Sequence, residues 1–355
     1  MRRSREAGIG LDELAQAARN HGMPLEALRA DVTPPGMHYV LVHYDVPFVD
    51  AAAHTIAFEG FDRPLELALD DLRARPAVTM PITFECAGNG RALFETRAVS
   101  QPWLLEAVGT GEWTGTPLSP LLREAGVPSG TVEVLFTGLD RGIEGGRAQA
   151  YERALPLAEA MRDDVLLVYE MNGQPLLPQH GAPLRLLVPG WYGMANVKWL
   201  TRIVALPEPH RGHQNAVAYR IRTTDDEEGR PVTRIRVRSL IAPPGIPSFP
   251  ERERVLSPGP VMLEGRAWSG SGPVERVEVS VDGCATWEAA RLDPAPSPWA
   301  WHRWTFGWTA SPGVHDIASR ATDATGATQP LQPEFNLGGY ENNAVHRLRV
   351  TVTES

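Results

Sequence analysis

The pattern of the chain changes at a segment rich in proline and glycine, "IAPPGIPSFPERERVLSPG", residues 241–259. Beyond it, short runs such as "VERVEVSVDG" and "HRLRVTVTE" alternate apolar and polar residues between turns, which predicts strands and no helix. Six of the ten tryptophans fall in this part and can supply the core of a small β domain. The C-terminal third is therefore predicted to be an immunoglobulin-like β-sandwich.

The first two thirds of the chain mix strand-like and helix-like runs. Residues 11–30 predict a short amphipathic helix, and "MHYVLVHYDVP", residues 37–47, predicts a strand that Pro47 ends. The apolar face of that helix would carry Leu11, Leu14, Ala15 and Ala18. Between residues 55 and 240, runs such as "TIAFEG" and "DVLLVYEM" alternate irregularly with helix-like runs such as "LSPLLREAG". This predicts an α+β protein in three parts: a helical extension (1–34), a mixed α and β domain (35–240) and the sandwich (241–355).

Charge and hydropathy exclude several classes of function. The formal net charge is −9 and the basic residues are scattered, which argues against a nucleic-acid or anionic membrane surface. No apolar stretch of signal-peptide or membrane-spanning length is present. A soluble, cytoplasmic protein is the expectation, with a periplasmic location still open if the chain was trimmed.

A cysteine in "FECAGNGR", residues 84–91, follows an apolar run and precedes a glycine-rich loop. Gly88 and Gly90 would let the backbone adopt positive φ and approach a bulky ligand, and Arg91 would favour the thiolate that binds metals. The second cysteine, Cys284, is far away, and neither CxxC nor CxxCH occurs. Hence no disulfide framework, zinc ribbon or c-type haem is indicated. The alternative is a buried cysteine at a strand end, followed by an ordinary turn.

A second segment, "QHGAPLRLLVPGWYGMANVKWLTRI", residues 179–203, gathers His180, Arg185 and Lys198 among glycines and prolines. Three basic groups beside backbone turns suit a phosphate. Of the 34 lysine and arginine residues, Lys198 is the one lysine. An ammonium at this position suggests a site that is too small for a guanidinium. A buried strand flanked by solvated charges is the other interpretation.

Taken together, several motifs resemble the catalytic core of the sulfite oxidase family of molybdenum enzymes, from about residue 35 to the C-terminus. They are "CAGN", "YEMNGQPL", "HGAPLRLLVPG", "VKWL", "AWSGSGPVERVEVSVDG" and "NLGGYENNAVHRLRV". The resemblance implies a molybdopterin-binding domain at 35–240, a dimerisation domain at 241–355 and one molybdopterin that carries molybdenum, with no haem in this chain.

The resemblance also implies roles for individual residues. Cys86 would be the protein's one ligand to the metal, and Tyr219 and Arg91 would join it as catalytic residues. Trp113, in "GEW", resembles a tryptophan of the substrate pocket, although it and Tyr219 could equally be core aromatics. The cofactor-binding positions implied are His43, Cys86, Asp140, His180, Arg185 and Lys198.

Two departures from the family pattern concern the substrate. Leu41 stands where the family carries an arginine, and in "WAWHRW" His302 stands where an arginine is usual, with Arg303 beside it. His302 is therefore the fourth expected catalytic residue, with Arg303 as its substitute. A dianion in a water-poor site needs compensating cations, so the anion site is expected to be weaker and more apolar than in sulfite oxidases.

Three functions follow. The first is oxidation of sulfite or a related small oxyanion to sulfate, by oxygen-atom transfer at a cysteine-ligated molybdenum. The second, suggested by Leu41, is reduction of an S-oxide or N-oxide with the same cofactor. The third is a cofactor-free protein, either a thiol nucleophile at Cys86 with His43 or His180 as its base, or a binding module. By resemblance, the partners would be an external electron acceptor or donor such as a cytochrome, and a second copy of the chain in a homodimer.

Overall fold

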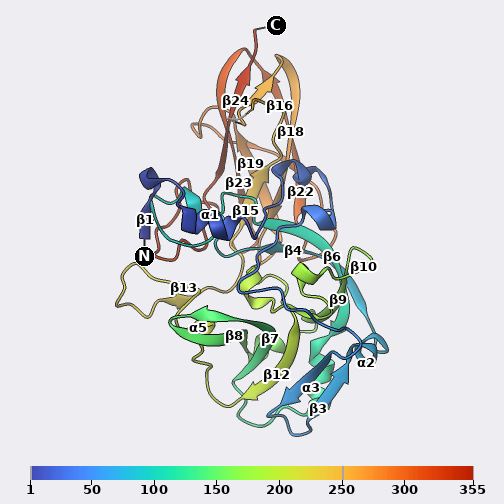
Figure 1. Cartoon of the computed structure of the whole chain (residues 1–355). Coiled ribbons are helices and arrows are strands. Elements are labelled where there is room, and N and C mark those ends of the chain that lie inside the picture. The colour runs from blue at the N-terminus through green and yellow to red at the C-terminus, as the bar shows by residue number, and fades with distance from the viewer. Residues whose placement is uncertain (1, 250–251, 355) are drawn as a thin grey trace.

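The computed structural model describes residues 2–249 and 252–354, so Met1, Ser355 and two residues of the proline-rich segment lie outside the described part. The molecule is elongated (Figure 1). The C-terminal strands form its upper end, the mixed part forms its lower end, and the N-terminal segment lies beside the junction. The expected combination of a mixed α and β domain with a β-sandwich is confirmed.

Two five-stranded sheets organise the lower part. The first runs β10-β9-β6-β4 with β11 also paired to β9, and the second runs β3-β2-β12-β7-β8. The strands of the first sheet are β4 (Val78–Glu85), β6 (Val108–Pro117), β9 (Leu166–Met171), β10 (Gln174–Pro175) and β11 (Arg185–Leu187). Those of the second are β2 (Thr55–Glu59), β3 (Leu65–Ala68), β7 (Glu133–Glu144), β8 (Arg147–Pro156) and β12 (Leu200–Leu206).

The helices of the described chain are short. They are α1 (Leu11–Ala17), α2 (Leu69–Arg73), α3 (Leu118–Ala125), α4 (Leu157–Ala160) and α5 (His213–Ala216). Helix α3 follows the expected pattern, because Leu118, Leu121, Leu122 and Ala125 lie three or four residues apart and are all buried. Gly126, at φ +74, then ends it. Burial of each leucine contributes about 1.5–3 kcal/mol, which fixes this short helix against the sheets.

The upper part is a sandwich of a four-stranded sheet, β15-β18-β22-β21, and a six-stranded sheet, β16-β17-β24-β23-β19-β20. The first contains β15 (Arg238–Ile241), β18 (Gly259–Trp268), β21 (Arg291–Leu292) and β22 (His302–Ala310). The second contains β16 (Ile246–Pro247), β17 (Arg254–Leu256), β19 (Val274–Ser280), β20 (Glu288–Ala289), β23 (Gly313–Asp323) and β24 (His346–Val352). Its core includes Trp304, but Trp268 and Trp301 pack into the core of the lower part, so they join the two parts.

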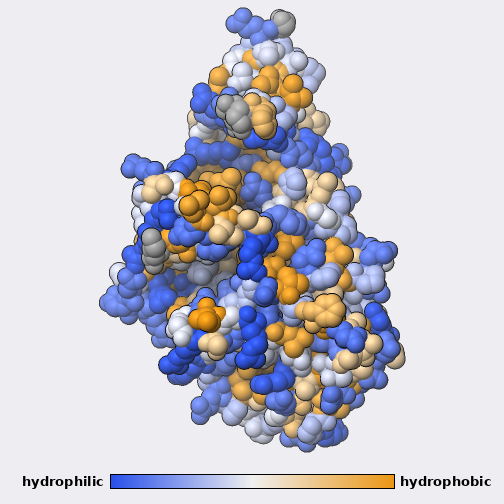
Figure 2. Space-filling view, in the orientation of Figure 1, coloured by the Kyte–Doolittle hydropathy of each residue, from blue (hydrophilic) through white to orange (hydrophobic). Residues whose placement is uncertain are grey.

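Two sequence expectations near the N-terminus are wrong. Residues 11–30 form α1 and a separate 3-10 helix, Leu25–Arg29, and the leucines of the expected apolar face are exposed (Leu11 85%, Leu14 54%). Figure 2 shows a hydrophobic patch at the height of α1. Residues 37–47 form a loop with one isolated bridge, His21–Val40, instead of a strand.

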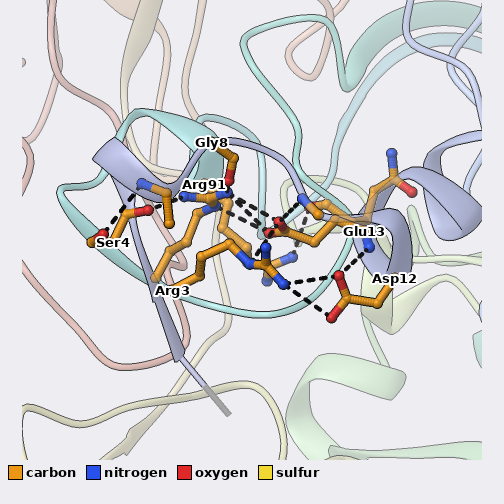
Figure 3. A network of polar contacts seen from close by, with 10 residues as sticks. Arg3, Ser4, Gly8, Asp12, Glu13 and Arg91 are labelled. Atoms are coloured by element: carbon orange, nitrogen blue, oxygen red, sulfur yellow. Dashed lines mark hydrogen bonds and ion pairs between the residues drawn. The ribbon is translucent and has the colours of Figure 1, made fainter.

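The N-terminal segment is held in place by a buried ion pair, and not by the apolar helix face that the sequence predicted. Glu13 is fully buried and pairs with Arg97, which is 1% exposed, at 3.1 Å. Figure 3 shows Glu13 surrounded by polar contacts, with Arg3 and Asp12 beside it. The pairing of β1 (Arg2–Ser4) with β5 (Thr96–Ala98) holds the same two segments together.

Two further strands, β13 (Arg220–Ile221) and β14 (Arg230–Pro231), form a small hairpin before the sandwich. Among residues 2–249 and 252–354, no helix has the length and apolar character needed to cross a membrane.

Candidate active site

Cys86 lies directly after β4, at the start of the loop that ends in the 3-10 helix Arg91–Leu93. Gly90 adopts φ +87, as expected, whereas Gly88 does not have positive φ. A Cβ atom on Gly90 would lie 2.8 Å from Asn342 Nδ2, and one on Gly88 would lie 2.7 Å from Arg91 Cζ. The glycines therefore admit the side chains of Arg91 and of the C-terminal part.

Two cavities meet at Cys86. The first has a volume of about 690 Å³ when the space open to solvent is included. All six positions expected to bind the cofactor line it, together with Tyr219: His43, Cys86, Asp140, His180, Arg185 and Lys198. We call it the cofactor cavity. The second, about 1040 Å³ with its open part, is lined by Cys86, Arg91 and Tyr219, among others, and we call it the substrate cavity.

The cofactor cavity contains buried polar atoms that bond none of the described residues. They are His38 Nε2, Asp140 Oδ1, His180 Nε2 and Arg185 Nε. In contrast, Lys198 Nζ donates to the carbonyls of Leu41 (2.8 Å) and Gln179 (3.0 Å). Buried polar groups are almost always paired in native proteins, with protein, water or a ligand, so these four atoms in one cavity offer hydrogen bonds to a polar ligand.

Burial perturbs the ionisable groups of this cavity strongly. It lowers the pKa of His180 to about 2 and that of His38 to about 4, so both imidazoles are neutral at pH 7. Burial, reinforced by the charge of Arg185, lowers the pKa of Lys198 to about 7. Burial raises the pKa of Asp140 to about 6, although the charges of Lys198 and His43 oppose the rise. An anionic ligand would restore the charge of Lys198 and compensate Arg185.

Trp113 is fully buried and lines neither cavity, so the structure places it where the alternative of a core aromatic expected it. Its ring stacks on Phe84 with centroids 4.7 Å apart, and the Arg185 guanidinium lies 5.2 Å from its centroid. Trp113 is thus a core aromatic whose ring makes a cation–π contact with the Arg185 guanidinium.

In the substrate cavity, Arg91 is buried and fixed. Its Nε donates to Gly338 O (2.9 Å), its Nη1 donates to Gln101 O (3.3 Å), and its guanidinium lies over the ring of Tyr340 at 5.0 Å. Nη2 bonds none of the described residues, so it remains free to donate to a ligand. The buried Cys86 thiol lines the same cavity, and burial raises its pKa while the charge of Arg91 lowers it.

Tyr219 combines burial with an unusual backbone. Its φ is +48, which is rare for a bulky residue and indicates that the surrounding structure imposes this conformation. Its ring lies 5.3 Å from that of Tyr340, and burial raises the pKa of its phenol well above the ordinary value. The hydroxyl is therefore a permanent donor or acceptor and not a phenolate.

A carboxylate that the sequence did not indicate, that of the partly exposed Glu144, lines the substrate cavity; we call its position the rim. Glu144 Oε2 accepts from Gln214 Nε2 (2.7 Å) and Tyr44 Oη (2.9 Å), and lies 3.1 Å from His43 Nε2. Burial alone would raise the pKa of Glu144, but these three contacts lower it to about 2. Glu144, whose side chain is 31% exposed and also lies 3.4 Å from His213 Nε2, thus keeps its negative charge in this cavity.

The C-terminal residues that reach the substrate cavity are not those expected. His302 lies on β22, with Nδ1 3.1 Å from Asp293 O, and lines neither cavity. Arg303 pairs with Glu264 at 2.9 Å instead. Neither His302 nor Arg303 lines the cofactor cavity or the substrate cavity, so the structure does not bring the two residues to the candidate site. Tyr340 takes that place, and its segment lies within the motif "NLGGYENNAVHRLRV".

The residues present fit a molybdenum–pterin cofactor. Within the described ranges, no three His, Cys, Asp or Glu side chains form a group that could hold an ion, so a metal at Cys86 must bring most of its ligands with it. A pterin dithiolene does so. Arg185 and Lys198 would hold its phosphate, and Asp140 and His180 would hydrogen-bond its polar groups.

Comparisons with known proteins define the class. Residues 43–214 match the family model "Oxidoreductase molybdopterin binding domain", and residues 230–353 match "Mo-co oxidoreductase dimerisation domain". The chain is 35% identical to sulfite oxidase of Gallus gallus over an alignment of 364 positions, gaps included, which covers 95% of this chain and 77% of that protein. The chain therefore belongs to the sulfite oxidase family of molybdenum enzymes, and the expectations of a molybdopterin cofactor and an oxidoreductase are confirmed.

The relatives differ in what they act on. The chain is 35% identical to mitochondrial sulfite oxidase of Homo sapiens, of whose length it spans 62%. It is 32% identical to nitrate reductase [NADH] 1 of Arabidopsis thaliana, of which it spans 38%. The crystal structure of the sulfane dehydrogenase SoxCD from Paracoccus pantotrophus superposes with a TM-score of 0.82 at 27% identity, covering 94% of this chain and 86% of that chain. Family membership thus fixes the cofactor and leaves the substrate open.

Proposed function

We propose that this enzyme oxidises sulfite, or a closely related small sulfur oxyanion, to sulfate. The observation that carries the proposal is the position of Arg91: a buried guanidinium with one free nitrogen, in the cavity that Cys86 and Tyr219 also line. The sulfite oxidases among its relatives and the sulfane dehydrogenase support a sulfur substrate.

In this proposal the residues bind and orient the substrate, and Cys86 is the one protein ligand of the metal. When bound, the cofactor supplies two-electron oxygen-atom transfer: sulfite and water become sulfate, two protons and two electrons. Arg91 Nη2 donates to a sulfite oxygen, Tyr219 Oη donates to a second, and the apolar side chain of Leu41 limits water. The electrons leave to an external acceptor, for which a cytochrome is our candidate.

The test is turnover of the molybdenum-loaded enzyme with sulfite and ferricyanide or cytochrome c. We expect sulfate to form with two equivalents of acceptor reduced. Full molybdenum loading without turnover would contradict the proposal, and nitrate with reduced viologen is included in the same panel because of the plant relative.

A second candidate is reduction of an S-oxide or N-oxide. It is favoured by Glu144, whose carboxylate on the cavity rim repels a dianion but not a neutral oxide, and by Leu41 in place of a cation. This candidate predicts that dimethyl sulfoxide or trimethylamine N-oxide oxidises reduced viologen in the presence of the enzyme. No oxidation with either compound would remove it.

We also propose that the enzyme is a homodimer through its C-terminal sandwich. The match of residues 230–353 to a dimerisation domain supports this. Sedimentation equilibrium should give twice the chain mass of 38.8 kDa, and a monomer at micromolar concentration would refute it.

A further inference from the structure

The loop that carries Cys86 is held from outside by the C-terminal part of the chain. Glu341 N–H donates to Ala87 O (2.8 Å), and Asn342 Nδ2 donates to Gly90 O (2.9 Å). With the bond from Arg91 to Gly338 O, segment 338–342 contacts the loop at three points. The position of the loop therefore depends on how the sandwich docks.

A second contact between the two parts lies on the inner side, at the residue before Cys86. Glu85 is 1% exposed; its Oε1 accepts from Arg238 Nη1 and from Asn89 Nδ2 (3.0 Å), and its Oε2 accepts from Trp268 Nε1 (2.8 Å). Arg238 begins β15 and Trp268 ends β18, paired in register, so both donors come from the sandwich. The carboxylate at the end of β4 is thus fixed chiefly by residues more than 150 positions away.

Stability alone does not account for this ion pair. Arg238 is 1% exposed, yet its Nε and Nη2 bond none of the described residues. A buried pair with unsatisfied nitrogens is a poor stabiliser compared with apolar side chains of similar volume. The Arg238 guanidinium does place a positive charge beside the carboxylate of Glu85, the residue that precedes Cys86.

We propose that Arg238 is a positioning residue for Cys86 that acts through Glu85. It holds the end of β4, and it compensates the negative charge of Glu85, the residue next to the sulfur that would bind the metal. The sandwich thereby tunes the metal centre as well as providing a dimerisation domain. This inference rests on the proposed role of Cys86 as the metal ligand, and is independent of the substrate.

The test uses the loaded enzyme and its variants Arg238→Gln, Glu85→Gln and the double variant. The readout is the midpoint potential of the bound molybdenum, followed by electron paramagnetic resonance during a redox titration. An uncompensated carboxylate stabilises the more oxidised metal, so Arg238→Gln should lower the midpoint. Glu85→Gln leaves the cation uncompensated and should raise it, and the double variant should return close to wild type.

The matched control is Arg97→Gln, which breaks the equally buried Glu13–Arg97 pair; the side chain of Arg97 bonds Glu13, Ser4 and Gly8, and no described residue of the Cys86 loop. It should lose thermal stability and keep the wild-type midpoint and spectrum. The inference is overturned if the two single variants shift the midpoint in the same direction or not at all.

If a single variant does not accumulate in folded form, the double variant decides the question. Recovery of wild-type molybdenum content and spectrum in the double variant supports coupling between the two side chains, and the same loss as in the singles overturns it. Cys86→Ser, measured in parallel, separates the two proposals, because normal molybdenum loading in that variant would refute the ligand assignment instead.

Discussion

The two cavities that share Cys86 differ in how their polar groups are satisfied. In the cofactor cavity, His180 and Asp140 each have a buried atom that bonds none of the described residues and is available to a polar ligand. In the substrate cavity, Arg91 and Glu144 already make two or more contacts within the protein. A cavity built around a fixed cofactor has polar atoms that the protein leaves without hydrogen bonds. In the substrate cavity, protein hydrogen bonds hold the polar side chains in place, and only single atoms stay available to a ligand. For this reason the cofactor is far better defined than the substrate.

The largest expected effect is on the residue that both cavities share. Cys86→Ser replaces the thiolate ligand with a weakly acidic hydroxyl, so molybdenum should fall to background while the fold is kept. Elemental analysis and circular dichroism measure the two quantities. Wild-type molybdenum content in a folded Cys86→Ser protein would mean that the metal is held elsewhere.

Removing the lysine should damage the cofactor cavity alone. Lys198→Met takes away a charge expected to meet the phosphate, which is worth about 1.5–3 kcal/mol, so cofactor affinity should drop roughly 10- to 150-fold. Cofactor retained after gel filtration, measured by pterin fluorescence, gives the comparison. The KM for sulfite of the fraction that stays loaded should not change, and a raised KM would show that the two cavities are not separate.

The reverse test affects only the substrate cavity. Arg91→Met should raise the KM for sulfite by roughly 10- to 100-fold, because one hydrogen bond to a charged group is lost, while molybdenum content stays normal. Steady-state kinetics on enzyme of known metal content measures this. An unchanged KM would argue that sulfite is not bound by Arg91 and would favour the oxide-reductase candidate.

In cofactor-free protein, the pH dependence of the free energy of unfolding should depend on the buried imidazoles of the cofactor cavity. The pKa of His38 is about 4 in the folded protein and 6.5 in the unfolded chain, so between these values the unfolded chain binds more protons. The free energy of unfolding of cofactor-free protein should therefore fall as the pH drops from 6.5 to 4, by about 3 kcal/mol from this residue. Urea titrations should show a shallower fall in His38→Phe, and parallel curves for the two proteins would contradict the assignment.

The smallest effect is expected on the rim. Glu144→Gln removes a negative charge near the entrance, which should lower the KM for sulfite by roughly fivefold, equivalent to about 1 kcal/mol. Higher salt should reduce the difference between variant and wild type because the rim is partly exposed. A KM that rises in Glu144→Gln would show that the carboxylate positions His43 or Tyr44 for substrate and does not repel it.

Much of the cofactor cavity could be predicted from the sequence. The motifs around Cys86, His180, Arg185 and Lys198 are short and contiguous, so the local backbone places each side chain in nearly the same way wherever the motif occurs. Tyr219 could be predicted for the same reason, although its left-handed backbone could not.

The prediction that the first helix packs through its leucines was wrong, and the reason is physical. Leu11 and Leu14 have the spacing of an apolar helix face, but both are exposed. The residue of this helix that is buried is Glu13, because it forms an ion pair with Arg97 on a distant strand. Helical periodicity describes which residues share a face, and cannot tell which face finds a complementary surface.

The amino-acid sequence was enough to predict the family, the cofactor and the side chains expected to bind it, because those features depend on local motifs. The folded structure was needed to show that Tyr340 and not His302 packs on Arg91, that Glu144 lines the substrate cavity, and that Arg238 bonds Glu85. Those contacts join residues 100 or more positions apart, so they depend on how two sheets and a sandwich dock, and no local pattern encodes that docking.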